Sequence, residues 1–208
     1  MVVVATKNPG KARDIHHLLG ADIELAPLPA DAADVEETGA TFEDNAILKA
    51  RAAAALVGGP AIGDDSGLEV DALDGAPGVR SARFAAADQP RGADRKNLDA
   101  ANNDKLLAAL AGVPTERRTA RFRSVLAFVD GPTLLVAHGT CEGIILEAPR
   151  GSGGFGYDPL FFCPPLGRTF AEADITDKAR VSHRARAAAA LLPRLRAHFE
   201  VAKSRKSK

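Results

Sequence analysis

The sequence has no tryptophan, a single tyrosine and no net charge. With one Tyr and no Trp, little aromatic surface is present on which single-stranded bases could stack. The 27 Lys and Arg residues are matched by 27 Asp and Glu residues, so no global field recruits nucleic acid or an anionic membrane surface. We therefore expect no nucleic-acid partner, and any affinity for phosphate has to come from a local group of residues.

Long apolar runs are absent as well, and cysteine is scarce. No run approaches the roughly 20 apolar residues of a membrane-spanning helix, and the N-terminus, Met1 to Ala5, lacks the basic flank and the length of a signal peptide. The two cysteines, Cys141 and Cys163, match no CxxC or zinc-binding spacing. We expect a cytoplasmic protein with no membrane partner and with reduced thiols.

Two adjacent carboxylates stand in a short stretch framed by glycines, Gly63 to Gly67. Asp64, Asp65 and Ser66 follow the apolar run at residues 60–62, so we expect them at the end of a strand. Buried, unpaired charge is unfavourable in a core, whereas Mg²⁺ binds through one or two carboxylates plus substrate phosphates. A carboxylate beside such an ion can also accept a proton from water. The alternative is a polar turn between strands.

A possible anion site follows the first strand. The apolar run Met1 to Ala5 predicts a buried strand, and helical spacing of apolar residues begins at Ala12. Between them, Thr6, Asn8 and Lys11 supply a hydroxyl, an amide and a cation, and loop and helix-terminal N–H groups would face the strand end. The glycine spacing does not fit a Walker loop. An ordinary turn with an N-cap is the alternative.

The remaining pattern predicts a mixed α/β fold. Thr41 and Asp44 have the spacing of a capping box, which predicts a helix to Val57. The acidic pair Glu36 and Glu37 precedes this helix. It either interacts favourably with the helix dipole or provides a second carboxylate ligand for a metal. Strands are predicted at 22–27, 119–129, 133–140 and 143–147, and helices at 96–111 and from Ser182 onward. Residues 119–129 and 133–140 should pair antiparallel, so the sheet must be mixed.

Three stretches carry weaker signals. Residues 151–156 fit the G-x-G-x-x-G pattern, but they precede a Pro-broken extended segment rather than a helix, which rejects dinucleotide binding. A loop that brings its backbone close to a ligand is still plausible there. Residues 85–95 are polar and read as a mobile loop, and Pro193 should kink or shorten the last helix. Residues 201–208 form a basic tail that we expect to be disordered.

Six short motifs occur in order along nearly the whole chain, from Val2 to about His198. They are Thr6-x-Asn8-x-x-Lys11, Glu37-Thr38-Gly39-x-Thr41-Phe42-x-x-Asn45-Ala46-x-x-Lys49-Ala50, Asp64-Asp65-Ser66-Gly67-Leu68, Gly75-x-Pro77-Gly78-x-x-Ser81-Ala82-Arg83, Gly153-Gly154-Phe155-Gly156-Tyr157-Asp158-Pro159 and Lys178-x-x-x-Ser182-His183-Arg184. As a set they resemble the inosine-triphosphate pyrophosphatase family, which hydrolyses non-standard purine nucleoside triphosphates such as dITP, ITP and XTP.

The resemblance implies a long, twisted, mixed sheet flanked by helices, with two lobes around a central cleft. Residues 1–200 would form one nucleotide-pyrophosphatase domain, and the protein would be a homodimer. Asp65 would be the general base and a Mg²⁺ ligand, and Glu37 would help to hold the metal. The substrate-binding residues it implies are Thr6, Lys7, Asn8, Pro9, Gly10 and Lys11 for the triphosphate, Lys49 for negative charge, Ser66, then Phe155, Gly156, Tyr157 and Asp158 for the nucleoside, and Lys178, His183 and Arg184 for the base and phosphates.

The expected function is Mg²⁺-dependent hydrolysis of dITP, ITP and XTP to the nucleoside monophosphate and pyrophosphate, which removes them from the nucleotide pool. Lys178 and Arg184 are candidate donors to the 6-oxo group that distinguishes hypoxanthine and xanthine from adenine. A pyrophosphatase for modified pyrimidine nucleotides is one alternative. A nucleotide-binding regulator without chemistry is another, although Glu37, Asp64 and Asp65 argue against it. A nucleic-acid binder would use the basic tail.

Overall fold

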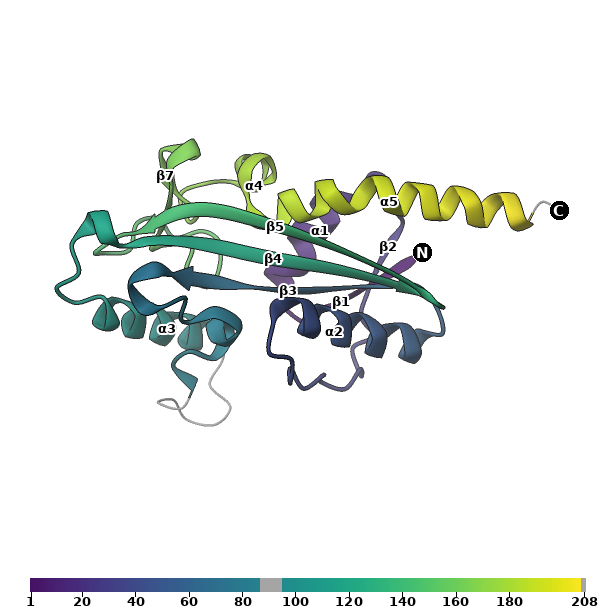
Figure 1. The fold of residues 1–208 in the computed structure, drawn as a ribbon, viewed down its shortest axis with the longest axis horizontal. Helices are drawn as coiled ribbons and strands as arrows, with labels where there is room; N and C mark the ends of the chain where they lie inside the picture. Colours follow the sequence, from purple (N-terminus) through teal and green to yellow (C-terminus); the bar gives the residue numbers. More distant parts are fainter. Residues whose placement is uncertain (87–94, 207–208) are drawn as a thin grey trace. The chain divides into compact units, whose positions relative to one another are not determined.

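The structure is a computed structural model that describes residues 1–86 and 95–206. Most of the polar loop expected at 85–95, and the last two residues of the expected basic tail, lie outside these residues. The strands are β1 (Val2–Ala5), β2 (Leu25–Pro27), β3 (Ala61–Val70), β4 (Thr119–Asp130), β5 (Thr133–Ile145), β6 (Phe161–Cys163) and β7 (Arg168–Thr169). They form a seven-stranded sheet in the order β2-β1-β3-β4-β5-β6-β7 (Figure 1).

The sheet is mixed, as the sequence predicts. β1 pairs in parallel with both β2 and β3, whereas β6 pairs antiparallel with both β5 and β7. Two residues connect β4 to its neighbour β5, and so short a connection joins antiparallel strands. The expectation of an α/β fold with helices flanking a mixed sheet is confirmed.

The chain divides into two compact units. Unit 1 comprises Met1–Asp65, Ser124–Gly139 and His183–Lys208, and unit 2 comprises Ser66–Arg123 and Thr140–Ser182. The residues of β3, β4 and β5 are therefore divided between the units. The expected central cleft stays a prediction.

β3 runs straight through the two aspartates. We expected a strand end or a turn at Gly63 to Gly67, but β3 continues from Ala61 to Val70, so this expectation was wrong. Glycine and charge usually mark a turn, but here partners on both faces of the strand accommodate the charges. Because side chains alternate along a strand, Ile62 and Asp64 point to one face, and Gly63 and Asp65 to the other.

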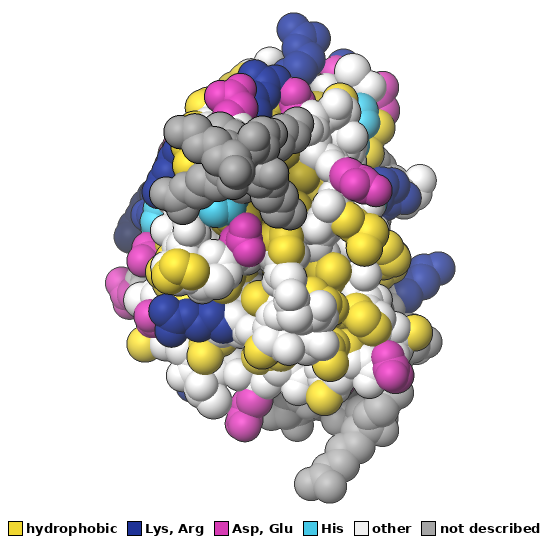
Figure 2. Space-filling view, turned by 90° about the vertical axis from the view of Figure 1, so that its right-hand side faces the viewer, with side chains coloured by type: hydrophobic (Ala, Val, Ile, Leu, Met, Phe, Trp, Pro, Cys, Tyr) yellow, Lys and Arg dark blue, Asp and Glu magenta, His cyan; other side chains and the backbone are white. Residues whose placement is uncertain are grey.

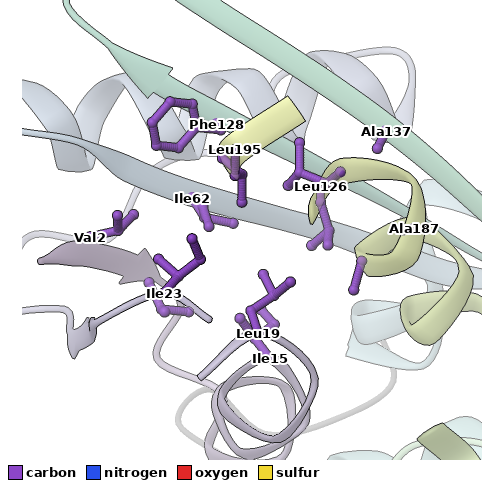
Figure 3. Close-up of a cluster of buried hydrophobic side chains, with 13 residues drawn as sticks. Val2, Ile15, Leu19, Ile23, Ile62, Leu126, Phe128, Ala137, Ala187 and Leu195 are labelled. Carbon is purple, nitrogen blue, oxygen red and sulfur yellow. The ribbon is translucent and has the colours of Figure 1, made fainter. Parts of the chain in front are cut away.

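In unit 1, helices cover both faces of the sheet (Figure 1). α1 (Pro9–Leu19) and α5 (His183–Lys206) lie on the face of Ile62, where both contribute to its hydrophobic cluster. α2 (Phe42–Val57) lies on the other face, where Ala53 packs with Ala61. Figure 3 shows Val2, Ile15, Leu19, Ile62, Leu126, Phe128 and Leu195 in the first cluster. Burial of these side chains fixes α1 and α5 against the strands that carry Asp64 and Ser124.

Unit 2 has its own core. It contains α3 (Arg95–Ala109) and α4 (Ile175–Val181). Leu106 and Leu110 pack with Phe122, Phe161 and other buried side chains, and the ring centroids of Phe122 and Phe161 are 4.6 Å apart. The two thiols, Cys141 and Cys163, are buried in the same cluster, and their sulfur atoms lie 3.8 Å apart without forming a disulfide. The same cluster contains Tyr157 and Leu160, so the segment between β5 and β6 shares this core with α3.

Several element boundaries differ from the prediction. The strand expected at 143–147 is the end of β5, which runs unbroken from Thr133 because alternation of buried and exposed residues continues through Cys141 and Glu142. Pro193 lies inside α5 and does not end it. α5 also continues through residues 201–206 of the expected tail. The helix start at Thr41 is confirmed, since Thr41 and Asp44 form the reciprocal capping box.

The surface carries charges of both signs. On the face seen in Figure 2, acidic and basic side chains are interspersed with hydrophobic ones, as the balanced composition predicts. Within the described part of the chain, no helix combines the length and the apolar character that crossing a membrane requires.

Candidate active site

The first helix follows β1 almost at once and begins with a capped turn. α1 starts at Pro9, three residues before the predicted helical spacing, and Asn8 is its N-cap. The Asn8 side-chain oxygen accepts hydrogen bonds from the N–H groups of Gly10 at 2.9 Å and Lys11 at 3.3 Å. Thr6 Oγ1 accepts one from the Asn8 N–H at 3.1 Å. Of the expected loop, residues 6–8 connect β1 to α1, and residues 9–11 form the first turn of the helix, where the helix dipole favours an anion.

Asp64 is the centre of a buried charge network on the face of β3 covered by α1 and α5. Its carboxylate lies 2.8 Å from Lys11 Nζ and 2.9 Å from Arg184 Nε, and Ser124 Oγ donates to it at 3.1 Å. The guanidinium of Arg184 also contacts Asp14 Oδ2 at 2.8 Å. Burial favours a higher pKa for Asp64, but Arg184 and Lys11 outweigh burial and hold this pKa well below its usual value.

The two cations of this network are compensated to different extents. Burial lowers the pKa of Arg184, but Asp64 and Asp14 more than offset it, so the net pKa of Arg184 is raised. Burial also lowers the pKa of Lys11, and Asp64 offsets this only in part, so the net pKa of Lys11 is lowered. A buried ammonium whose pKa is lowered has too little negative charge around it. A phosphate group beside Lys11 would therefore be stabilised.

Asp65 faces α2 and belongs to a second network. Lys49 Nζ lies 2.7 Å from Asp65 Oδ1 and 2.8 Å from Glu37 Oε1. Asn45 Nδ2 donates to Asp65 Oδ2 at 3.3 Å, and Asn45 Oδ1 accepts from the Gly39 N–H at 2.8 Å. One ammonium thus bridges two carboxylates, and one buried amide ties the Glu37 loop to β3.

Burial gives Asp65 the basicity that a proton acceptor needs. It raises the pKa of Asp65, and Lys11 and Lys49 offset only part of this effect. For Lys49, burial favours a lower pKa, but Asp65 and Glu37 outweigh it, so the pKa of Lys49 is raised and the ammonium stays charged. A carboxylate with a raised pKa that is held beside cations is suited to general-base chemistry.

Gly63 allows α2 to approach β3 closely. A Cβ at Gly63 would collide with the carbonyl oxygen of Ala46 and would lie 2.7 Å from the backbone nitrogen of Ala50. Asn45 and Lys49 stand one residue before these two alanines, four residues apart on the same side of α2. The close approach therefore brings the amide and the ammonium to Asp65.

Unit 2 presents the Gly-rich segment at residues 151–158. Asp158 Oδ2 accepts hydrogen bonds from Lys178 Nζ at 2.6 Å and from the Phe155 N–H at 3.1 Å. Gly154 has φ of 73°, and a Cβ there would collide with the Asp158 carboxylate, so only glycine fits. The buried Tyr157 hydroxyl donates to the Ser81 carbonyl at 2.9 Å.

The structure groups many of the expected site residues. Unit 1 brings Lys11 and Arg184 together at Asp64, and Glu37 and Lys49 together at Asp65. Lys7 is half-exposed and pairs with Asp34. His183 is buried at the start of α5. Ser66, Phe155, Gly156, Tyr157, Asp158 and Lys178 belong to unit 2.

Asp14, Asn45 and Ser124 received no role from the sequence, and Asp64, one of the two adjacent carboxylates considered for a metal, pairs with Lys11 and Arg184. These four residues hold the charged groups of the two networks in place. The usable signal was a polar residue on an otherwise apolar face: Ser124 shares a strand face with Phe122 and Leu126 and is 1% exposed. Asp14 gave no such signal, because it lies three residues after Lys11 on a helix with many polar positions.

The donor set beside Asp65 fits a divalent cation. Within residues 1–86 and 95–206, no three His, Cys, Asp or Glu side chains are gathered as a metal-binding group. The carboxylates of Glu37 and Asp65 nevertheless converge on a single cationic atom, Lys49 Nζ. Glu36 is exposed, so the geometry favours Glu37 of the acidic pair. Two carboxylate ligands are what Mg²⁺ commonly uses when phosphates complete its coordination.

A capped helix start beside β1, buried lysines and paired carboxylates are typical of α/β proteins that bind phosphate-bearing small molecules. The model of the Ham1 family matches residues 2–194, and the chain belongs to this family. It is 49% identical over 201 residues to the dITP/XTP pyrophosphatase of Yersinia pseudotuberculosis, covering 94% of this chain and 98% of that protein. It is 51% identical over 191 residues to the dITP/XTP pyrophosphatase of Geobacillus kaustophilus, covering 89% of each.

Solved structures agree with this assignment. A HAM1 protein from Coxiella burnetii superposes with a TM-score of 0.79 at 42% identity, covering 93% of this chain and 97% of that one. A nucleoside-triphosphatase, dITP/XTP pyrophosphatase, from Mycobacterium abscessus gives a TM-score of 0.69 at 43% identity, covering 92% and 98%. The family resemblance predicted from the six motifs is confirmed.

Proposed function

We propose that this protein hydrolyses the non-standard purine nucleoside triphosphates dITP, ITP and XTP to the nucleoside monophosphate and pyrophosphate. Water attacks the α-phosphorus, and the bond from that phosphorus to the oxygen bridging the α- and β-phosphates breaks. The proton of the attacking water passes to the Asp65 carboxylate, and pyrophosphate leaves with the bridging oxygen. Hydrolysis of this kind depends on positioning and charge neutralisation more than on covalent catalysis.

The observation that carries the proposal is the pairing of Asp65 and Glu37 around the Lys49 ammonium, together with a second buried lysine, Lys11, that Asp64 compensates only in part. Lys49 Nζ lies within 2.8 Å of both carboxylates, and burial lowers the pKa of Lys11. The names of the relatives, dITP/XTP pyrophosphatases at 49% and 51% identity, support the same chemistry. The combination suits a substrate that brings several negative charges and a metal ion.

Each group of residues has a distinct task in this proposal. The start of α1, from Thr6 to Lys11, binds the triphosphate with backbone N–H groups and the Lys11 ammonium. Glu37 and Asp65 would hold Mg²⁺, which supplies charge neutralisation on the phosphates when bound. Lys49 holds the two carboxylates close to each other through its ammonium group. Asp65 accepts the proton.

The nucleoside is proposed to lie against Phe155, Gly156, Tyr157 and Asp158. Lys178, 13% exposed at its side chain and paired with Asp158, is the proposed donor to the 6-oxo group of the base. Arg184 was the other candidate donor, but its guanidinium contacts Asp64 and Asp14. We propose that Arg184 acts on the phosphates through Asp64 and Lys11. A homodimer in the cytoplasm, where nucleotides are made, is part of the proposal, and light scattering in solution tests the dimer.

The decisive assay is pyrophosphate release from dITP, XTP, dATP and dUTP, each with Mg²⁺ and with EDTA. We expect turnover of dITP and XTP only with the metal. Preferential turnover of dUTP would favour the pyrimidine alternative, and binding without turnover would favour a regulator. Asp65→Asn should lower kcat by about 10³-fold or more, whereas Asp31→Asn, an exposed carboxylate of the same unit, should not change it.

A matched pair of variants tests the metal ligand. Glu37→Gln should raise the Mg²⁺ concentration needed for half-maximal activity by about tenfold. Glu36→Gln changes the neighbouring, exposed carboxylate and should leave the requirement unchanged. Equal effects of the two substitutions would reject Glu37 as a ligand.

A further inference from the structure

Two side chains of helix α3 form hydrogen bonds with the N–H group and the carbonyl group of Gly156. Asp99 Oδ2 accepts a hydrogen bond from the Gly156 N–H at 2.8 Å, and Asn103 Nδ2 donates one to the Gly156 carbonyl at 2.9 Å. Asp99 and Asn103 are four residues apart, so they lie one above the other on the same face of the helix. Nothing in the sequence of this helix indicated a functional role. We call these two residues the α3 clamp.

The amide of Asn103 can be oriented in only one way. Nδ2 also donates to the carbonyl of Asp99 at 2.8 Å, so both of its hydrogens are engaged. Among the described residues, Asn103 Oδ1 has no hydrogen-bond partner although it is buried. Turning the amide over would place this oxygen against two carbonyl oxygens. The clamp is therefore directional. Asp99 accepts a hydrogen bond from the Gly156 N–H, and Asn103 donates one to the Gly156 carbonyl.

The clamp binds a glycine whose backbone conformation other residues rarely adopt. Gly156 has φ of 62°, a left-handed conformation that side-chain-bearing residues rarely adopt. Around it, Asp158 binds the Phe155 N–H and the Tyr157 hydroxyl binds Ser81. Each of the residues 155–158 thus has a hydrogen-bonding partner, and α3 supplies the partners of the central peptides. A carboxylate acceptor makes the bond to Gly156 a strong one.

We propose that Asp99 and Asn103 are positioning residues for base recognition. They set the direction of the Gly156 peptide groups and hence the place of Phe155 and Asp158, which flank it. This inference rests on the proposed function, in which residues 155–158 receive the nucleoside. Because Asp65, Lys49 and Lys11 lie on other elements, β3, α2 and α1, loss of the clamp changes how the base is held and leaves the hydrolytic step largely intact.

The variants that break the clamp are Asp99→Ala and Asn103→Leu. Each should raise KM for dITP about tenfold and lower the ratio of kcat/KM for dITP to that for dATP by a similar factor, while kcat changes less than threefold. Asp99→Asn keeps an oxygen that accepts from the Gly156 N–H, so it should restore both quantities to within about threefold of the unsubstituted protein. Asp104→Ala, an exposed aspartate of the same helix, is the matched control and should change neither.

A second measurement does not depend on the substrate. Hydrogen exchange followed by mass spectrometry should show faster exchange in the peptide that covers residues 153–158 in Asp99→Ala, but not in Asp104→Ala. Should Asp99→Ala fail to fold, Asn103→Ser carries the same comparison, because it removes the amide and leaves the carboxylate.

The outcomes separate the two proposals. Unchanged exchange at 153–158 overturns the clamp whatever the enzyme hydrolyses. An unchanged KM and base ratio, or a fall in kcat that is equal for every base, assigns Asp99 and Asn103 a structural role only and also overturns the inference. If the unsubstituted protein releases no pyrophosphate from dITP or XTP, the proposed function fails, and with it the role in base recognition, while faster exchange would still establish the contact.

Discussion

The two units hold their candidate site residues by different kinds of interaction. In unit 1, ion pairs of 2.7–2.9 Å at Asp64 and Asp65 fix Lys11, Lys49 and Arg184. In unit 2, hydrogen bonds to main-chain groups of Gly156 and Ser81 fix the Gly-rich segment, together with the ion pair of Lys178 and Asp158. The first arrangement suits a ligand rich in charge, and the second suits a flat, neutral base that is read by hydrogen bonds.

The same comparison distinguishes two neighbouring residues within unit 1. Asp64 and Asp65 adjoin in sequence but face opposite sides of β3. Asp64 is fully buried among cations that hold its pKa down, whereas burial raises the pKa of Asp65 and its cations only partly offset this. Asp64 is therefore a fixed anion that organises the site, and Asp65 is the better proton acceptor.

The largest expected effect comes from Asp64→Asn. Removing the carboxylate leaves Arg184, 2% exposed, and Lys11 as buried cations, and breaking a buried ion pair in this way costs about 3–5 kcal/mol. We expect the melting temperature to fall by about 6–20 °C. Asp65→Asn should lower it by less than half as much, because Glu37 stays beside Lys49, and should instead abolish turnover. Equal melting temperatures for the two variants would contradict the division of roles.

Gly63→Val should have the next largest effect. The new side chain meets the backbone of Ala46 and Ala50 in α2, so the helix has to move away from β3. Overpacking of this kind typically costs about 1–3 kcal/mol, and the displaced Lys49 and Asn45 would no longer reach Asp65. We expect both a lower melting temperature and a loss of activity. Gly59→Val, where the nearest atom to a Cβ is 4.0 Å away, is the control.

Asn45→Ala should have an intermediate effect. It leaves the Gly39 N–H and Asp65 Oδ2 without their amide partner, and loss of a buried hydrogen-bonding partner costs about 1–3 kcal/mol. Because Asn45 ties the Glu37 loop to Asp65, the Mg²⁺ requirement should rise as it does in Glu37→Gln. Calorimetric titration of Mn²⁺ into both variants measures this without turnover. Unchanged Mn²⁺ affinity in Asn45→Ala would show that the amide supports the fold alone.

Local rules predicted the parts of the fold that depend on neighbours in sequence. The capping box of Thr41 and Asp44, the start of α5 after Ser182 and the mixed sheet all follow from spacing over a few residues. The candidate site residues come from the family that the motifs resemble, and the roles carried over from it stay predictions. The pairing of Lys49 with Glu37 and Asp65 is consistent with that transfer.

The misses have a common physical cause. β3 could not be recognised as one strand, because the partners that accommodate Asp64 lie far away in sequence: Arg184 is 120 residues distant. The α3 clamp was missed for the same reason, since Asp99 and Gly156 are 57 residues apart. Charged or polar residues inside regular elements are unfavourable by local rules, and only the folded chain shows which distant groups compensate them.

The smallest expected effect concerns a surface pair in unit 2, which provides the contrast to Asp64. A hydrogen bond from Arg121 and one from Thr119 lower the pKa of Asp71, although the side chain of Asp71 is 43% exposed. Since the folded state binds its proton more weakly than the unfolded state, Asp71 stabilises the fold above its ordinary pKa, and this contribution is lost as the pH falls through the lowered value.

Asp71→Asn should therefore cost about 0.5 kcal/mol or less at pH 7, and the difference from the unsubstituted protein should disappear once the pH falls below the lowered pKa of Asp71. Added salt should reduce it at pH 7, because an exposed pair is screened. Urea unfolding of both proteins at several pH values measures the effect. A cost as large as that of Asp64→Asn would show that exposure does not separate the two networks, and the contrast between buried and surface charge in this protein would have to be abandoned.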